Sequence, residues 1–325
     1  MLQNDAEMKR YHSTRSESCS SSVDLSVIIL TFNEEVNLSA ALNSVSGWAR
    51  EIFVVDSYST DQTVDICLAR KEEGIHVVQH EFIDYSRQWN WALQNLPITS
   101  SWTLKLDADE RVTPEFQSEV RKLIQTAANE LDGVYFRRRI VFMGGVLRWS
   151  GVKANYDLRL WRTGKAYFEP RPVNEHALVK GGTWHLQSCV LHENTKSIAD
   201  WLDKHNRYSS MEVINIIENN VTGDIAPRIF GNATERRMFL RKLRLVLPCK
   251  AFLSFIYIYI IRLGFLDGRS GFRYAILKSA FAYWIHLKVT EYYRTGRKPE
   301  VVWPQRGVAN PNVHGNAQCG NNPIP

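Results

Sequence analysis

Two carboxylates stand one residue apart in the middle of the chain. Asp107 and Asp109 come directly after Trp102–Leu106, a run that predicts a buried strand. Residues i and i+2 of an extended backbone point to the same face, so both side chains converge at the end of that strand, where open α/β sheets bind ligands. Paired carboxylates make chemical sense when a hard divalent cation lies between them and a diphosphate. The alternative is a solvated acidic turn ahead of Pro114.

A second acidic position ends another expected strand. Asp56 follows Ile52–Val55 and can accept hydrogen bonds from a nucleobase or a ribose. The helix expected after Ser59–Asp61 offers backbone N–H groups to a phosphate. The alternative interpretation, of equal weight, is that Ser59–Asp61 only cap that helix. The sequence contains no G-x-G-x-x-G after a strand and no P-loop, which disfavours dinucleotide oxidoreductases and P-loop NTPases.

The elements that must position these residues alternate between strand and helix in the first part of the chain. Thr31–Glu34 matches a capping box for the first helix, and Thr113-Pro114 matches the start of a later one. This alternation predicts a parallel, doubly wound sheet with strands at residues 25–30, 52–55, 75–78 and 102–106.

After Gly133 the pattern changes. Strand-like segments follow one another with no clear helix between them, which predicts a mixed or antiparallel extension of the sheet over Val134–Val141, Tyr156–Trp161 and Gly182–Leu191. A helix is expected again at Ser197–Asn219, before a basic and aromatic segment over Glu235–Tyr293.

Composition sets broad limits on the function. The 325 residues are 44% hydrophobic and 23% charged, which is typical of a globular protein with one large or two modest domains. The net charge of +6 favours an acidic partner. Five scattered cysteines without a Cys-x-x-Cys pair argue against a disulfide framework and a zinc site, and fit a reducing cytosol. Because no RNA- or DNA-binding motif occurs, no nucleic-acid partner is expected.

Taken in order, these motifs resemble those of family 2 glycosyltransferases, which have the GT-A nucleotide-diphospho-sugar transferase fold. The resemblance is closest to the bacterial branch that adds glucose to the heptose region of the lipopolysaccharide core, and it covers roughly residues 24–293. The matching segments are Ser26–Glu35, Asp56–Thr63, Arg87–Leu93, Asp107–Glu110, Asn174–His176 and Lys204–Ser210.

The resemblance implies a UDP-sugar donor and a divalent cation, Mg²⁺ or Mn²⁺. Asp56 would contact the uracil, Asp107 would approach the ribose, and Asp109 would ligate the cation that bridges the pyrophosphate. Arg87 would help to hold the phosphates, unless it is an exposed helix arginine.

Family 2 enzymes mostly invert the anomeric centre, which requires a general base for the acceptor hydroxyl. Glu175 is the candidate, the alternative being a surface carboxylate paired with an arginine. A later histidine completes the metal site in many proteins of this fold, and His192 fits by position unless it is structural. His176 and His185 are weaker candidates.

Three further residues are assigned to the acceptor by the same resemblance. Trp149 lies in a loop between Gly144 and Gly151 that is similar to the glycine-bearing acceptor loop of the fold. Lys204 and Arg207 belong to the basic side of the Ser197–Asn219 helix, which is either an acceptor surface or a solvated face.

The C-terminal segment combines apolar and basic residues. Ala251–Ile261 is apolar on every side but shorter than the roughly 20 residues of a membrane span. Arginine and lysine recur around it, which predicts in-plane contact with anionic lipid, or alternatively a helical subdomain packed on the catalytic domain. These basic residues are Arg236, Arg237, Arg241, Lys242, Arg244, Arg262, Arg269, Arg273 and Lys278.

We therefore expect a disordered segment 1–23, a GT-A catalytic domain 24–195, a helical membrane-associating region 196–300 and a disordered tail 301–325. The expected activity is inverting, metal-dependent hexose transfer from a UDP-sugar to a lipid-linked glycan, at the cytoplasmic face of the inner membrane. The alternatives are a transferase for exopolysaccharide or another lipid glycan, and an inactive scaffold. The scaffold is suggested because Ser57 and Tyr58 replace the Asp and Gly of the common family pattern.

Overall fold

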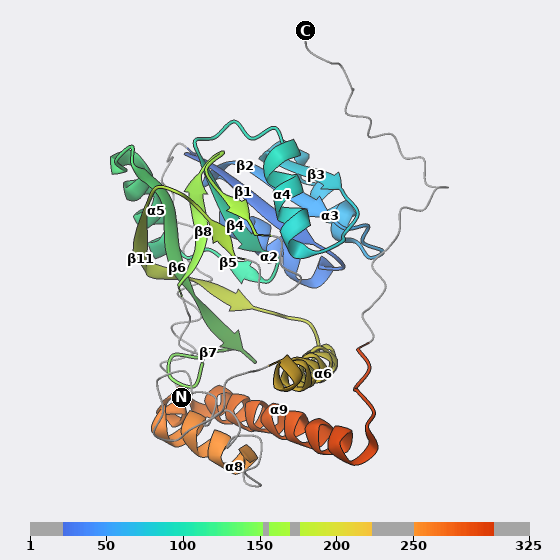
Figure 1. The fold of residues 1–325 in the computed structure, drawn as a ribbon. Coiled ribbons are helices and arrows are strands. Elements are labelled where there is room, and N and C mark those ends of the chain that lie inside the picture. Colours follow the sequence, from blue (N-terminus) through green and yellow to red (C-terminus); the bar gives the residue numbers. More distant parts are fainter. Residues whose placement is uncertain (1–21, 152–155, 170–175, 223–249, 302–325) are drawn as a thin grey trace.

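A computed structural model describes residues 22–151, 156–169, 176–222 and 250–301. Within these ranges, a nine-stranded sheet has the order β3-β2-β1-β4-β8-β6-β11-β5, with β7 paired to β6 (Figure 1). Two short strands, β9 (Tyr167–Phe168) and β10 (Ala177–Leu178), pair separately. The sheet strands are β1 (Val23–Thr31), β2 (Ala49–Asp56), β3 (Ile75–Gln79), β4 (Trp102–Asp107), β5 (Glu110–Arg111), β6 (Leu131–Phe142), β7 (Gly145–Val146), β8 (Asp157–Arg162) and β11 (Gly182–Glu193).

The direction of the strands changes halfway across the sheet. Strands β3, β2, β1 and β4 run parallel to one another. Strand β8 is antiparallel to both β4 and β6, while β11 is parallel to β6 and antiparallel to β5. The predicted parallel half and its mixed extension are therefore both confirmed.

Helices cover both faces of the parallel half. Helices α2 (Glu35–Val45), α3 (Thr63–Leu68) and α5 (Pro114–Thr126) share one buried core with the sheet, and α4 (Tyr85–Asn95) contributes to the core on the other face. Consecutive strand residues explain this division, because Val27 and Ile29 of β1 belong to the first core and Ile28 to the second.

The two predicted helix starts have different outcomes. Thr113 caps α5 as expected, with its hydroxyl oxygen accepting the Phe116 amide at 3.2 Å and Pro114 as the first helical residue. The predicted capping box at Thr31 is wrong. Thr31 is the last residue of β1 and its hydroxyl donates to Asp56 Oδ1 at 3.0 Å, while α2 begins only at Glu35.

The C-terminal helices form a separate layer below the sheet in Figure 1. They comprise α6 (Ile198–Thr222), α8 (Lys250–Phe255), the π-helical turn η2 (Ile256–Ile261), the 3₁₀ turn η3 (Gly264–Asp267) and α9 (Gly268–Thr295). Between α6 and α9, Val213 and Ile217 pack against Ile285 and Val289. By length and composition, none of the helices described here suffices alone as a membrane span, whereas Lys250–Ile261 and Gly264–Thr295, bent by 75°, pass such a test together.

Most of the two predicted terminal segments lies outside the described residues, which begin at Ser22 and end at Val301. The same holds for the basic residues between 236 and 244. The predicted domain boundary at residues 195 and 196 falls just before α6 and stays a prediction.

Asp267 fastens the start of α9 to the turn that follows β7. Its buried carboxylate accepts the backbone N–H groups of Arg148 at 2.9 Å, Trp149 at 3.0 Å and Ser150 at 2.7 Å. The Ser150 hydroxyl adds a fourth donor at 2.6 Å. This carboxylate therefore joins the C-terminal helices to the sheet domain.

Asp267→Ala is expected to lower the free energy of unfolding by about 3 kcal/mol, because it leaves the buried amide and hydroxyl of Ser150 and two partly buried amides without their acceptor. Urea unfolding of the full chain measures the change. Asp203→Ala, an exposed aspartate on α6, is the control. A loss in Asp267→Ala no larger than that of the control would contradict the role of Asp267 as a clamp.

Candidate active site

A cavity of about 1100 Å³ lies where β1 and β4 end, at the sheet edge that the motifs predicted. Strand ends supply Thr31, Asp107 and His192 to its wall, and Lys204 reaches it from α6. The cavity is thus bounded by the sheet on one side and by a C-terminal helix on the other.

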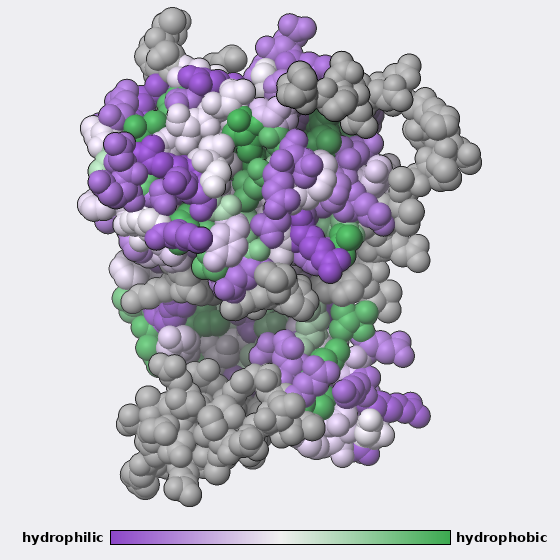
Figure 2. Space-filling view, turned by 45° about the horizontal axis from the view of Figure 1, so that its top comes forward, coloured by the Kyte–Doolittle hydropathy of each residue, from purple (hydrophilic) through white to green (hydrophobic). Residues whose placement is uncertain are grey.

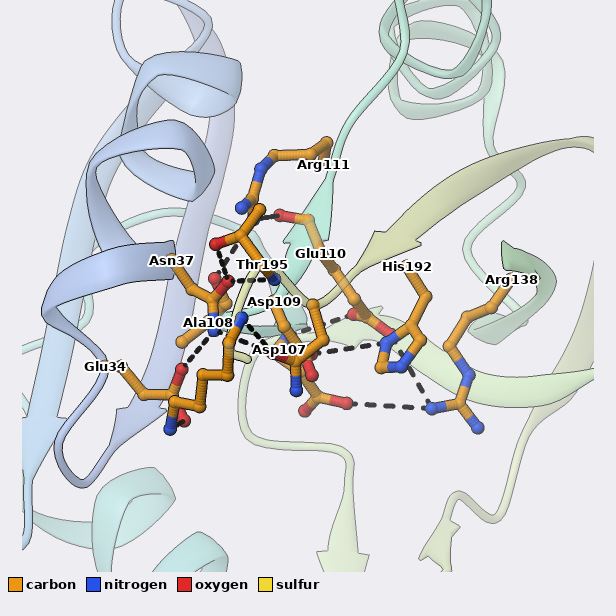
Figure 3. A network of polar contacts seen from close by, with 12 residues as sticks. Glu34, Asn37, Asp107, Ala108, Asp109, Glu110, Arg111, Arg138, His192 and Thr195 are labelled. Atoms are coloured by element: carbon orange, nitrogen blue, oxygen red, sulfur yellow. Dashed lines mark hydrogen bonds and ion pairs between the residues drawn. The ribbon is translucent and has the colours of Figure 1, made fainter. Parts of the chain in front are cut away.

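Two short strand ends bring Asp109 and His192 together. Strand β11 pairs antiparallel with β5, with His192 opposite Glu110. The Glu193 amide also donates to the Asp109 carbonyl at 2.8 Å. As a result, Asp109 Oδ1 faces His192 Nδ1 at 3.3 Å, although the two residues are distant in sequence (Figure 3).

The end of β11 is held in place by helix α2. Buried Asn37 accepts the amide of Thr195 at 2.9 Å and its hydroxyl at 2.8 Å, and donates to Glu34 at 2.7 Å. Lys196 completes the connection with a 2.6 Å ion pair to Glu34. Figure 3 shows this network beside the carboxylates, where it fixes the position of His192.

A buried ion cluster lies behind the first carboxylate. Arg159 donates to both oxygens of Glu110, at 2.9 and 2.8 Å, and to Asp107 Oδ2 at 3.1 Å. Glu110, which has no exposed surface, also accepts the Asp107 amide at 3.0 Å. Arg138 lies farther out, 3.8 Å from Asp107 and 3.7 Å from Glu110. The cluster holds the backbone and side chain of Asp107 in one position.

These charges set the protonation of the site. Burial opposes ionisation of Asp107, but Arg159 and Lys105 outweigh it and hold the pKa of this carboxyl well below its usual range. Burial raises the pKa of Glu110 to about 6, against the attraction of Arg159. Burial also opposes the charged forms of Asp109 and His192, but each favours the charge of the other, so the pKa of Asp109 is lowered and that of His192 raised.

Asp56 is placed beneath the cavity and does not line it. The side chain has no exposed surface, and its two oxygens accept hydrogen bonds from Thr31, Ser59 and Gln79. Its neighbour Ser57 and its hydrogen-bond partner Thr31 line the cavity. Contact between Asp56 and a base would require these bonds to rearrange, and its proposed role in base recognition stays a prediction.

The N-terminus of α3 is engaged by protein groups. The Thr63 amide donates to Asp61 at 3.0 Å, the Gln62 amide to Glu35 at 3.0 Å and the Thr60 amide to Asn33 at 2.9 Å. The alternative of a capped helix therefore describes this segment better than a phosphate site does.

Comparison with known proteins identifies the family. The protein-family model described as Glycosyl transferase family 2 matches residues 26–194 of the sequence, which is more than half of the chain. The chain belongs to glycosyltransferase family 2. Family membership and the mixed α/β sheet confirm the predicted GT-A class of fold and the assignment as an enzyme.

The chain is also similar to two relatives with the word glycosyltransferase in their names and to one solved structure. An uncharacterized glycosyltransferase of Rickettsia felis is 36% identical over 60% of this chain and 70% of its own, and one of Rickettsia typhi is 26% identical over 60% and 68%. The crystal structure of S. aureus TarS residues 1–349 in complex with UDP has 20% identity over 84% of this chain and 92% of that chain, with a TM-score of 0.43.

Asp109 and His192 suit a divalent cation in this family 2 enzyme. Nδ1 of His192 is buried with no hydrogen-bond partner and faces the Asp109 carboxylate. A carboxylate oxygen and an imidazole nitrogen are both ligands for such cations. Within the described ranges, no group of three or more His, Cys, Asp or Glu side chains is arranged to hold a metal. Among the described residues, Asp109 and His192 are therefore the ones that would hold a cation here.

The remaining predicted site residues fall into three groups. Lys204 lines the cavity, where Asp109 and Tyr208 outweigh the effect of burial and raise its pKa. Arg87, Trp149 and Arg207 are described but do not line the cavity. Arg87 is an exposed helix residue 3.3 Å from Asp84, the alternative given for it above.

The proposed base Glu175 lies outside the described residues. Its neighbour His176 lines the cavity, whereas His185 does not line it but stacks on Tyr135, which does. Sequence reasoning did not mark Arg159, Arg138 or Lys105 as site residues. Arg159 and Lys105 carried the same signal, because each is a charge between two leucines of an expected strand.

Proposed function

We propose that this family 2 enzyme transfers a hexose, glucose from UDP-glucose, to a lipid-linked glycan such as the lipopolysaccharide core. The reaction would invert the anomeric centre, require Mg²⁺ or Mn²⁺, and take place at the cytoplasmic face of the inner membrane. The observation that carries the proposal is the meeting of Asp107, Asp109, His192 and Lys204 at one end of the cavity.

Each of these groups has a task that follows from its position. Asp107, fixed by Arg159, would accept hydrogen bonds from the ribose. Asp109 and His192 would hold the cation, which when bound neutralises negative charge on the leaving diphosphate. Lys204 lies in the same wall and is kept charged by its surroundings, so its ammonium would add attraction for that diphosphate.

The acceptor side rests on the sequence assignment of Glu175 as the general base. Glu169 and His176 both line the cavity, one before and one after the segment that contains Glu175. Glu175→Gln is the variant to include in the assay below.

The test is product formation from a panel of UDP-sugars, with lipopolysaccharide truncated after its heptose region as acceptor. We expect UDP release and a mass increase of one hexose with UDP-glucose, in Mn²⁺ or Mg²⁺ and not in excess EDTA. Transfer of another sugar would replace glucose in the proposal. Absence of turnover with every donor and both cations, in folded protein, would refute it.

A further inference from the structure

The C-terminal helices carry most of the exposed apolar surface of the described chain. More than half of its exposed large hydrophobic side chains lie between Phe252 and Tyr293. On the α/β body, Figure 2 shows mainly hydrophilic and intermediate residues with hydrophobic ones in separate patches. Such a concentration of apolar surface marks an interaction site.

Helix α9 has two apolar stripes rather than one. Its exposed residues Phe272, Ile276, Tyr283 and Leu287 fall within an arc of roughly 60° at 3.6 residues per turn. A separate stripe, which includes Ile285, is buried against α6. Since α6 already covers the buried stripe, the exposed stripe is available to a partner.

The segment before α9 extends this exposed surface, which we call the α8–α9 face. Over α8 and η2, the exposed side chains are Phe252, Leu253, Tyr257, Ile260 and Ile261. Twelve helical residues reach only about 18 Å, against a hydrocarbon core of about 30 Å. The segment also meets α9 at an angle of 75°, so its geometry suits a helix lying along a surface.

Basic side chains border the α8–α9 face. Arg269 projects at the edge of the α9 arc and Arg273 roughly 40° beyond it, and both are exposed. An apolar stripe bordered by arginine complements a bilayer with anionic headgroups.

The same helices connect this face to the cavity. Lys288 of α9 is bound by four acceptors on α6, namely the carbonyl and side-chain oxygens of Asn206 and the hydroxyls of Ser209 and Ser210, at 2.7–2.8 Å. Two residues before Asn206, Lys204 lines the cavity. Figure 1 shows α6 between α9 and the sheet, so one helix layer separates the α8–α9 face from the reaction site.

We propose that the α8–α9 face docks in the plane of an anionic membrane, and that α6 thereby presents the cavity to acceptors anchored in that same membrane. This inference rests on the proposed function for the identity of the acceptor. The docking itself depends only on the surface.

The test is flotation of the full chain with phosphatidylglycerol–phosphatidylethanolamine vesicles and with phosphatidylcholine vesicles. We expect binding to the anionic vesicles at low salt and weak binding to the neutral ones. Ile276→Asp/Leu287→Asp should reduce binding at least tenfold, and Arg269→Gln/Arg273→Gln about fivefold per charge. The matched control is Val36→Asp/Leu68→Asp, because these residues of the catalytic body are 53% and 43% exposed, against 45% and 46% for Ile276 and Leu287.

Several results would overturn the proposal. The first two are no binding of the wild type to anionic vesicles and a loss of binding in the control variant equal to that in Ile276→Asp/Leu287→Asp. The third is bound protein that alkaline carbonate does not extract, which indicates insertion into the bilayer. The fourth is a dimer in solution that the Ile276→Asp/Leu287→Asp substitutions dissociate. UDP release from UDP-glucose with detergent-dispersed acceptor is measured in parallel. If the wild type fails to dock on anionic vesicles but still releases UDP, this inference fails and the proposed function stands. If UDP release is absent as well, the proposed function fails.

Discussion

Asp109→Asn is expected to lower kcat for sugar transfer by about 10²–10³-fold, while the free energy of unfolding stays nearly unchanged. Asparagine keeps the shape of the side chain but removes the charge that faces His192 Nδ1 at 3.3 Å. A group that stabilises developing charge in the transition state typically contributes an effect of this size. Steady-state kinetics with saturating UDP-glucose, together with urea unfolding, measures both quantities.

The cation dependence of the variant discriminates between two roles of Asp109. If Asp109 binds the cation, the Asp109→Asn variant should need a higher Mn²⁺ concentration for half-maximal activity. Asp203→Asn, an exposed aspartate on the cavity-lining helix α6, is the control and should behave as the wild type. Equal cation dependence in Asp109→Asn and the wild type would remove Asp109 from the metal site.

Much of the fold follows from local patterns in the sequence. The apolar runs of β1, β2 and β4 and the residues that end them can be recognised from neighbouring residues alone. Thr113-Pro114 likewise predicts the start of α5 without any knowledge of the tertiary structure. The error at Thr31 has a physical cause. Its hydroxyl has a buried carboxylate partner, Asp56, which lies on a neighbouring strand and is invisible to a motif that reads four consecutive residues.

The site was predictable where the sheet edge alone brings residues together. Asp107 and Asp109 needed only the end of one strand. His192 joins them through β5, a strand of two residues that carries no periodicity of its own. Asp56 shows the limit of the same reasoning, because the end of a strand fixes the position of a side chain but not whether other side chains enclose it.

Arg159 illustrates what sequence could not provide. Its partners Glu110 and Asp107 come from a different part of the chain, and only the antiparallel insertion of β8 beside β4 brings them within reach. Arg159 and Arg138 line the cavity, and the contacts of Arg159 with Glu110 and Asp107 hold the Asp107 side chain in position. The stability of the fold is therefore the quantity that the removal of Arg159 should change most.

Arg159→Met is expected to lower the free energy of unfolding by about 3–5 kcal/mol, because Glu110, which has no exposed surface, loses both hydrogen bonds from a cation and keeps only Arg138 at 3.7 Å. The exposed pair Arg70–Glu73 is a matched control. Arg70 also donates to both oxygens of its carboxylate, at 2.9 and 2.6 Å, through Nε and Nη2 where Arg159 uses Nη1 alone, and Arg70→Met should cost no more than about 1 kcal/mol. Urea unfolding of both variants measures the difference.

A double-mutant cycle separates the lost charge pair from lost packing. In Arg159→Met/Glu110→Gln no unpaired carboxylate is buried at position 110, so the double variant should be more stable than the sum of the single changes by about 2 kcal/mol or more. If the two changes add, Arg159 stabilises the fold through packing or through Asp107 instead. Because Glu110 also accepts the Asp107 amide, coupling in this cycle would mean that the charge pair fixes the backbone at the point where the proposed donor-binding carboxylates begin.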